Sequence, residues 1–329
     1  MRQSDPMQLF SQTAPWGLEL TGFGRPIGLG LDEQRRLLVT DMDYHAVIRL
    51  DADLRHYQCH DGLGKTWGGG QKVVAGKSTA RPRRLPGGWN GPHGVTTDGK
   101  GQLFVTCYYD PMIVALTPDG SARVLVGSEY LKGPATSRLD SQGRILVAEY
   151  ALNLLLAFSP NGEYLGRLGL APNEQILKFD LGRTGVPATT SPGGFDRLHM
   201  ALSTLDGLIL VADTWNHRLQ RFSAEGEYLG CLRTGQEWNA DTAPATPQFN
   251  PPIACPVAVD QSTSGQLLVT AWGSSQVLLF GPDGTPLSIG NLPSLNKPYD
   301  ARFVGDGIVI ADTHHGRVLV VDKIGLASA

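Results

Sequence analysis

Short apolar runs that end at a small or acidic residue recur along the chain. Each run is rich in Leu, Val and Ile, and most copies are followed by a turn, a second apolar run and a tight turn that contains Gly. Successive copies begin 66, 42, 64, 58 and 41 residues apart. A unit of about 41 residues, lengthened three times by insertions, is typical of a β-propeller. The six copies are Leu38–Asp41, Phe104–Cys107, Leu146–Glu149, Leu210–Asp213, Leu268–Ala271 and Val309–Asp312.

The repeat predicts an all-β fold, a six-bladed β-propeller with four-stranded blades, as a single domain over residues 1–329. The sixth unit ends with a third strand at 317–322 and lacks a fourth strand. We expect the N-terminal segment around Gln8–Ser11 to supply that outer strand and to close the ring, which removes an exposed strand edge. In the second unit the apolar pattern predicts strands over 94–98, 103–107, 113–116 and 122–126.

Three long insertions are rich in Gly, Pro, Asn and Thr. Each connects the fourth strand of one unit to the first strand of the next. The chain direction therefore places all three on the face that also carries the turns between the second and third strands, here called the b–c turns. Loops of this length on one face are typical of a functional rim or lid. The insertions span about 59–89, 169–196 and 233–253.

Composition and charge narrow the classes of function. The formal net charge is −3 and no basic run or stripe is present, so nucleic acid is not an expected partner. No stretch approaches 18 apolar residues and the N-terminus lacks an apolar leader, so we expect no membrane association and a cytoplasmic location. Four cysteines without CxxC spacing are expected to be free thiols.

Two of the repeats carry a recognisable motif. Residues 211–222 (VADTWNHRLQRF) and 311–318 (ADTHHGRV) resemble the signature of NHL-repeat propellers. The resemblance implies the propeller fold, and it leaves open enzymatic, protein-binding and RNA-binding functions. An Asp and an Arg five residues apart bracket the b–c turn in both copies and suit a local ion pair. We assign structural roles to Asn216, His217 and His315, because Asn and His tolerate turn conformations.

Alignment of the repeats singles out one position at the start of the first strand of each unit, here called the slot. Small apolar residues alternate there with residues that bind metals or move protons. Slots of neighbouring blades are about 60° apart around a six-bladed ring, so the second, fourth and sixth converge with threefold symmetry. Three protein ligands with one open position are the arrangement of a catalytic zinc. The slots hold Ile27, His93, Ala135, His199, Val257 and Tyr299.

The alternating slots resemble the propeller of peptidyl-hydroxyglycine α-amidating lyase. Pro92-His93 and Leu198-His199 match two motifs of that family, and Pro298-Tyr299 matches the third with Tyr in place of His. The resemblance implies a divalent metal, most simply zinc, held by His93, His199 and Tyr299, and no nucleotide cofactor. A relative that uses the same slots for other lyase, hydrolase or cyclase chemistry fits these substitutions.

The b–c turns are unusually aromatic, which suits a pocket for a mostly apolar organic molecule. Tyr109 or Tyr299 is a candidate proton donor or acceptor, and Asp300 is a candidate for orienting Tyr299. Arg138 is a candidate partner for a substrate carboxylate, although strand alternation places it opposite the slot. The candidate substrate-binding aromatic residues are Tyr44, Tyr108, Tyr150, Trp215 and Trp272.

Two functions from different classes remain open. The first is an enzyme that acts on a small organic molecule at the channel mouth, metal-assisted through His93 and His199. The second is a non-catalytic propeller that binds a protein or peptide partner through its insertion-rich face. The alternating slot distinguishes them, because a scaffold does not require it.

Overall fold

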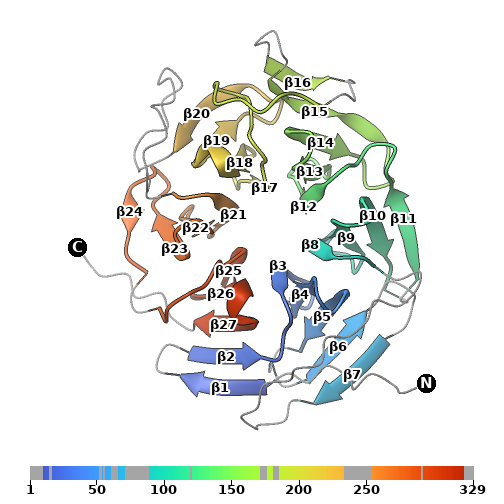
Figure 1. Cartoon of the computed structure of the whole chain (residues 1–329), viewed down its shortest axis with the longest axis vertical. Coiled ribbons are helices and arrows are strands. Elements are labelled where there is room, and N and C mark those ends of the chain that lie inside the picture. The colour runs from blue at the N-terminus through green and yellow to red at the C-terminus, as the bar shows by residue number, and fades with distance from the viewer. Residues whose placement is uncertain are drawn as a thin grey trace.

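A computed structural model shows six antiparallel sheets arranged as blades around a central channel (Figure 1). The six-bladed propeller predicted from the repeats is confirmed. The structure describes residues 10–14, 17–51, 54, 56–60, 66–70, 89–118, 121–170, 176–180, 185–232, 253–289 and 292–321.

The first three blades each begin at the channel and run outward in chain order. Blades 1 and 3 carry a fifth strand, which the repeat pattern did not predict. Blade 1 comprises β3 (Pro26–Leu31), β4 (Leu37–Asp41), β5 (Ala46–Leu50), β6 (His56–His60) and β7 (Thr66–Gly70). Blade 2 comprises β8 (Pro92–Thr97), β9 (Leu103–Cys107), β10 (Met112–Leu116) and β11 (Ala122–Val126). Blade 3 comprises β12 (Pro134–Leu139), β13 (Ile145–Glu149), β14 (Leu154–Phe158), β15 (Tyr164–Leu170) and β16 (Ile176–Asp180).

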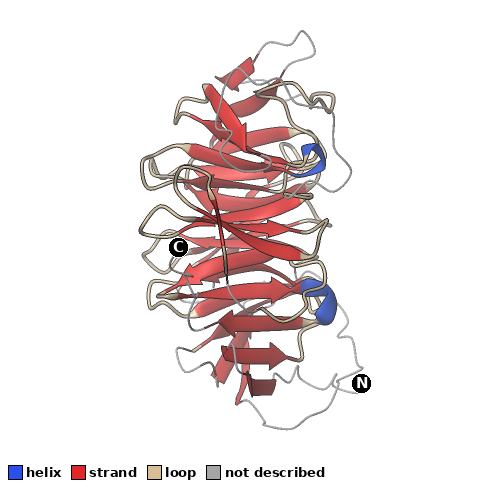
Figure 2. Cartoon of the chain, turned by 90° about the vertical axis from the view of Figure 1, so that its left-hand side faces the viewer, coloured by secondary structure: helices blue, strands red, loops and turns tan. Residues whose placement is uncertain are grey.

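The last three blades follow the same plan. The b–c turns of blades 4 and 6 contain the 3-10 helices η1 (Thr214–Asn216) and η2 (Thr313–His315), which lie on one face of the ring (Figure 2). Blade 4 comprises β17 (Met200–Ser203), β18 (Ile209–Asp213), β19 (Arg218–Phe222) and β20 (Tyr228–Leu232). Blade 5 comprises β21 (Pro256–Gln261), β22 (Leu267–Ala271), β23 (Gln276–Phe280) and β24 (Pro286–Leu287). Blade 6 comprises β25 (Asp300–Val304), β26 (Gly307–Asp312), β27 (Arg317–Val321), β2 (Gly17–Thr21) and β1 (Phe10–Ala14).

The ring closes through the N-terminus, as the missing outer strand predicted. The closing strand is β2, which pairs with β27. The segment expected to close the ring lies one strand further out, because Phe10 and Ser11 belong to β1, the fifth strand of the blade. The reason is apolar alternation, because Leu18 and Leu20 of β2 pack against the core that contains Val318. An outer strand that contributes to the core binds more strongly than one that only adds hydrogen bonds.

The core lies between neighbouring blades. Every residue of the second strand is buried in all six blades, from β4 through β26. Both faces of these strands pack against an adjacent sheet, which explains why the runs are continuously apolar and do not alternate.

Three expectations concern features beyond the blades. Placement of the three insertions on one face stays a prediction, because most of 59–89 and nearly all of 233–253 lie outside the described residues. All four cysteines are free and buried. The described part of the chain contains no helix with the length and apolar character needed to cross a membrane.

Candidate functional site

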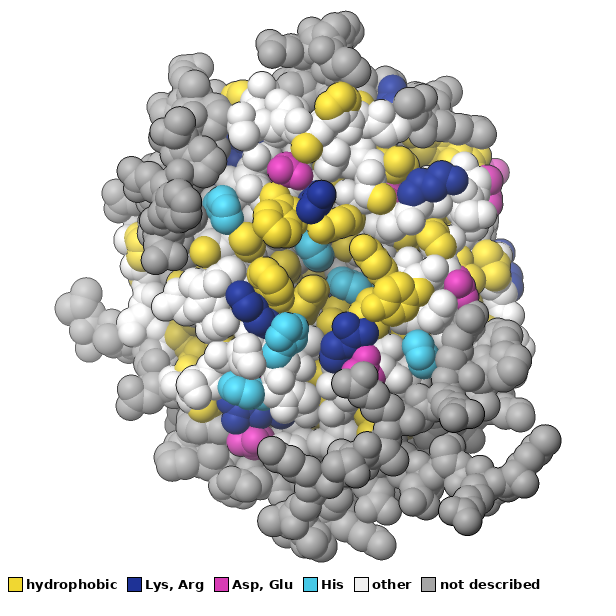
Figure 3. Space-filling model, in the orientation of Figure 1, with side chains coloured by type: hydrophobic (Ala, Val, Ile, Leu, Met, Phe, Trp, Pro, Cys, Tyr) yellow, Lys and Arg dark blue, Asp and Glu magenta, His cyan; other side chains and the backbone are white. Residues whose placement is uncertain are grey.

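The slot residues gather at a pocket of about 280 Å³ at one mouth of the channel. Ala135 is the one slot residue that does not line it. Figure 3 shows this mouth as a hollow with histidine at its centre and apolar side chains around it. The slot residues in the lining are Ile27, His93, His199, Val257 and Tyr299.

Three side chains form a nearly equilateral triangle at the floor of the pocket. The ring centroids of His93 and His199 are 6.2 Å apart, those of His93 and Tyr299 5.7 Å, and those of His199 and Tyr299 6.1 Å. The alternate slots therefore meet around the channel axis, although the residues are more than 200 positions apart at the extremes.

Hydrogen bonding determines which nitrogen of His199 carries the proton. The Thr214 hydroxyl donates to the Pro256 carbonyl at 2.7 Å, so its oxygen is left to accept from His199 Nδ1 at 3.0 Å. The Arg197 carbonyl, 3.3 Å from the same nitrogen, also only accepts. His199 is thus protonated on Nδ1, and its Nε2 holds the free lone pair. Burial lowers the pKa of His199 to about 4, so the ring is neutral at neutral pH.

His93 is the more deeply buried of the two imidazoles. Its Nδ1 has no hydrogen-bond partner within the described part of the chain. Burial, followed by the nearby His199, lowers the pKa of His93 to about 3. The backbone of Ala135 also interacts with this ring and opposes the fall of its pKa.

Tyr299 supplies the hydroxyl of the triangle. Burial raises the pKa of its phenol, so the group stays protonated and can donate a hydrogen bond or a proton. Its ring makes edge contacts with both imidazoles and with Trp272.

A threonine of the preceding blade fixes the backbone of each of these three slots. Each hydroxyl donates across the blade interface to the backbone carbonyl of the slot residue. The position of each slot side chain therefore depends on the preceding blade. The bonds run from Thr40 to His93 (2.9 Å), from Thr136 to His199 (2.6 Å) and from Thr270 to Tyr299 (3.3 Å).

The acidic residues that end the second strands hold the chain just before the slot. In four blades this carboxylate accepts the backbone N–H of the residue three positions before the slot. Cys107 and Ala271 take its place in the other two blades. The pairs are Asp41 with Gly24 (2.8 Å), Glu149 with Lys132 (3.1 Å), Asp213 with Asp196 (2.8 Å) and Asp312 with Asn296 (2.7 Å).

The expected ion pairs of the NHL-like motifs are present. Arg218 Nε donates to Asp213 at 2.7 Å, and Arg317 Nε donates to Asp312 at 2.7 Å. His315 and Asn216 also bond to these carboxylates, which agrees with their structural assignment.

Most of the predicted aromatic residues lie in the pocket wall. Tyr44 does not, because its side chain packs against the core of blades 1 and 6. The wall residues are Tyr108, Tyr109, Tyr150, Trp215 and Trp272.

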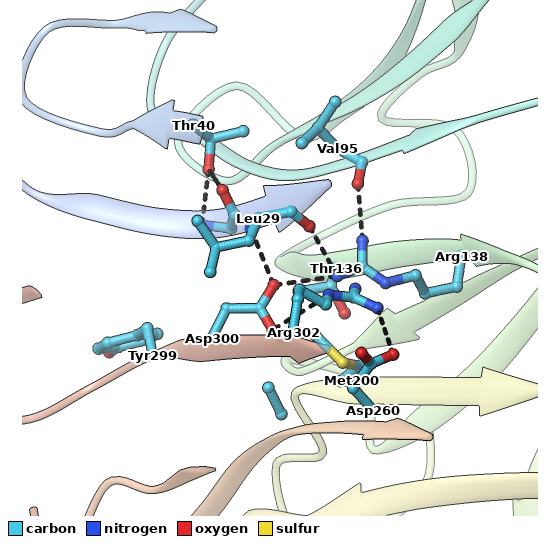
Figure 4. A network of polar contacts seen from close by, with 12 residues as sticks. Leu29, Thr40, Val95, Thr136, Arg138, Met200, Asp260, Tyr299, Asp300 and Arg302 are labelled. Carbon is cyan, nitrogen blue, oxygen red and sulfur yellow. Dashed lines mark hydrogen bonds and ion pairs between the residues drawn. The ribbon is translucent and has the colours of Figure 1, made fainter. Parts of the chain in front are cut away.

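The roles predicted for Asp300 and Arg138 differ from their positions in the structure. Strand alternation turns Asp300 away from Tyr299 and into the channel below the pocket, where its carboxylate accepts the Leu29 N–H at 2.8 Å and Arg138 Nη2 at 3.0 Å (Figure 4). Arg138 also donates to the carbonyls of Leu29 and Val95 and is buried. Neither residue lines the pocket, so both crosslink blades in the channel; Arg138 faces a separate cavity at the other end.

The donor set of the triangle falls short of a three-ligand zinc site. The two neutral imidazoles suit zinc, but the protonated Tyr299 phenol is a poor third ligand. Among the described residues, no group of three His, Cys, Asp or Glu side chains could hold a metal ion. The zinc expected from the sequence is untested, the donor set predicts weak retention of the metal, and we derive no step through a metal.

Sequence reasoning missed three basic residues at the pocket mouth. Arg25, Arg197 and Lys297 each stand two positions before a slot, so the same alignment of repeats would have found them. The equivalent residues in the other blades are Gly91, Gly133 and Cys255, so basic residues do not alternate regularly at this position as His and Tyr do at the slot.

Fold and site together define a six-bladed β-propeller with a pocket at its axis. No family model matches the sequence, and a comparison with curated proteins finds no match. The structure is similar to that of a catalytically inactive virginiamycin B lyase from Staphylococcus aureus with quinupristin, with 14% identity over 94% of this chain and 97% of that one and a TM-score of 0.56.

Other solved propellers are equally similar. A streptogramin B lyase shares 15% identity over 95% of this chain and 97% of its own, with a TM-score of 0.54. The WD40 propeller domain of Doa1 shares 9% identity over 97% of this chain and 100% of its own, with a TM-score of 0.55. Because lyases and a WD40 domain match equally well at such identities, the comparisons show the fold alone.

Proposed function

We propose that this protein is an enzyme of the lyase or hydrolase type that acts on a small organic molecule by acid–base chemistry in the axial pocket. The observation that supports it is the triangle of His93, His199 and Tyr299, in which every member is uncharged at neutral pH and faces one cavity. A binding scaffold gains nothing from two buried, neutral imidazoles at its axis, because buried polar groups cost stability unless they are satisfied.

In this proposal His199 is the general base. Its Nε2 lone pair accepts a proton from the substrate, while Thr214 holds the opposite nitrogen and fixes the ring. Tyr299 is the general acid: its phenol gives a proton to the atom that leaves. In an elimination, the electron pair of the broken C–H bond forms the new double bond, and the leaving group departs protonated. Solvent then returns the proton from His199 to Tyr299.

His93 lies close enough to share the substrate with both groups. Its imidazole lines the pocket beside the rings of His199 and Tyr299. The aromatic wall packs against the apolar part of the molecule and reduces the water around the reacting atoms, which strengthens these interactions.

A substrate screen with matched variants tests the proposal. Purified protein is incubated with a panel of small aromatic esters, lactones and β-substituted acids, and products are followed by mass spectrometry. We expect turnover that falls at least 100-fold in His199→Gln and Tyr299→Phe. Tyr130→Phe, partly buried in the turn between blades 2 and 3, and His315→Gln, on the b–c turn of blade 6, are controls that keep activity.

Two results would contradict the proposal that this protein is an enzyme. Equal turnover in wild type and His199→Gln removes the base from the mechanism. Absence of turnover across the panel, together with stoichiometric capture of a protein or peptide that a Trp215→Ala substitution abolishes, favours the binding module.

A further inference from the structure

Three basic side chains surround the mouth of the pocket (Figure 3). Arg25, Arg197 and Lys297 occupy one equivalent position in blades 1, 4 and 6, two residues before the slot. We infer that the pocket selects small organic anions, with an aromatic or similarly planar body against the wall and a carboxylate at this basic rim. This substrate class rests on the proposed function of the same pocket.

Two of the three cations are held directly against the pocket wall. The Arg197 guanidinium carbon lies 5.7 Å from the ring centroid of Tyr150 and 5.5 Å from that of Trp215. Lys297 Nζ lies 4.0 Å above the ring of Trp272. These cation–π contacts hold each charge beside an aromatic ring that lines the pocket. A planar ligand packed on these rings would therefore have a cation next to its outer edge.

Two of the three cations have no carboxylate partner within the described part of the chain. Arg25 is paired with Asp43 at 2.7 Å and also approaches the Tyr109 hydroxyl at 3.4 Å. Arg197 and Lys297, in contrast, have no carboxylate partner among the described residues. Among the described residues that line the pocket, none is Asp or Glu. The floor is neutral and the rim is positive, which favours an anion and disfavours a cation.

The backbone is strained at two of the three basic positions. Arg197 has a φ of 52° and Lys297 a φ of 51°, values in the left-handed region that favours glycine. The equivalent Gly91 adopts the same conformation with a φ of 66°. Carboxylates of Asp213 and Asp312 accept the backbone N–H of the preceding residue in these two blades. Cys255, at the equivalent position of blade 5, has a φ of 47°, so the left-handed conformation belongs to the backbone position, and the case for the cations rests on their contacts with the pocket wall.

Size limits the anion. An engineered cavity of about 150 Å³ holds benzene, so 280 Å³ accommodates roughly ten to eleven non-hydrogen atoms. A phenyl ring with a short chain and one carboxylate meets this limit, and a longer molecule would extend past the basic rim into solvent.

Binding of a matched ligand pair tests the inference. 3-Phenylpropanoate and its neutral amide have the same number of non-hydrogen atoms, and quenching of Trp215 and Trp272 fluorescence reports their binding. We expect the carboxylate to bind at least tenfold more tightly than the amide at low salt and to weaken as NaCl is added. The double variant Arg197→Gln/Lys297→Gln brings the ratio near one. Arg123→Gln, an exposed substitution on β11, leaves it unchanged.

The outcomes separate this inference from the proposed enzyme. Anion selectivity that persists in His199→Gln without turnover supports the basic rim, whatever the fate of the catalytic proposal. Selectivity in a wild type that turns over no compound and captures a protein or peptide through Trp215 counts against the enzyme and keeps the anion site. An amide that binds as tightly as the acid, a panel of aryl carboxylates none of which binds, or a ratio unmoved by the double variant overturns the inference.

Discussion

Replacement of Asp213 by Ala is the most informative test of how the blades are held. The carboxylate, fully buried, accepts four hydrogen bonds, from the Asp196 N–H and from the side chains of Asn216, Arg218 and Gln220. Arg218 is 1% exposed. Its other N–H groups donate to carbonyls at positions 190, 191 and 194, so one carboxylate organises the b–c turn and the segment that leads to His199.

The expected loss follows from these contacts. Asp213→Ala leaves a buried guanidinium without its counter-charge and removes one acceptor from three neutral donors, of which Asn216 and Gln220 keep a backbone carbonyl. Removal of one partner of a buried ion pair costs about 3–5 kcal/mol, because the remaining charge is left uncompensated. We expect the free energy of unfolding to fall by about 4 kcal/mol.

Urea denaturation followed by tryptophan fluorescence measures this loss, with the slope of the transition checked for constancy. Asp283→Ala, on an exposed turn where the carboxylate bonds Thr285, is the matched control and should cost less than about 1 kcal/mol. The double variant Asp213→Ala/Arg218→Met should lose less than the sum of its single variants, since no unpaired charge remains.

A loss below about 1 kcal/mol for Asp213→Ala would refute the reasoning. Additive effects in the double variant would do the same, because they would mean that the two side chains do not depend on each other.

Three further predictions follow from other parts of the structure. Burial raises the pKa of Glu149 to about 7 from an ordinary value of 4.5. Between these two pH values the folded carboxyl keeps a proton that the unfolded chain has released. The free energy of unfolding should therefore fall by up to about 3 kcal/mol as pH rises through this window. Glu149→Gln should flatten that slope, and an unchanged pH profile would contradict the assignment. Metal analysis of dialysed protein should find far less than one zinc per chain. Tyr299→His, which completes a set of three imidazoles, should raise zinc retention. Stoichiometric zinc in the wild type would show that Tyr299 is an adequate ligand. Leu20→Ala should cost about 3 kcal/mol, because Leu20 is fully buried where β2 closes the ring; a melting temperature equal to that of the exposed-site control Leu205→Ala would place the closing strand outside the core.

The expectation that failed most clearly concerned residues next to a slot. Asp300 follows Tyr299 directly, and proximity in sequence suggested that the two act together. In a strand, adjacent side chains face opposite sides, so the carboxylate lies in the channel with Arg138 and the phenol lies in the pocket. Tyr44 failed for a related reason, because turn position alone does not say which way a side chain packs.

By itself, the sequence determined the architecture of this protein. Six apolar runs at related spacing require six sheets packed face to face, and their alignment makes His93, His199 and Tyr299 equivalent by position. Periodicity carries that information because every residue of the second strands must be buried on both faces.

Only the tertiary structure decided what surrounds those positions. The proton on His199 is assigned through Thr214 and Pro256, which belong to two different blades. Arg197 and Lys297 are placed at the pocket rim by their contacts with Trp215 and Trp272. Such contacts join residues that are far apart in the chain, so no local pattern encodes them. The ring brings them together, and their distances and burial set the charge and protonation of the pocket.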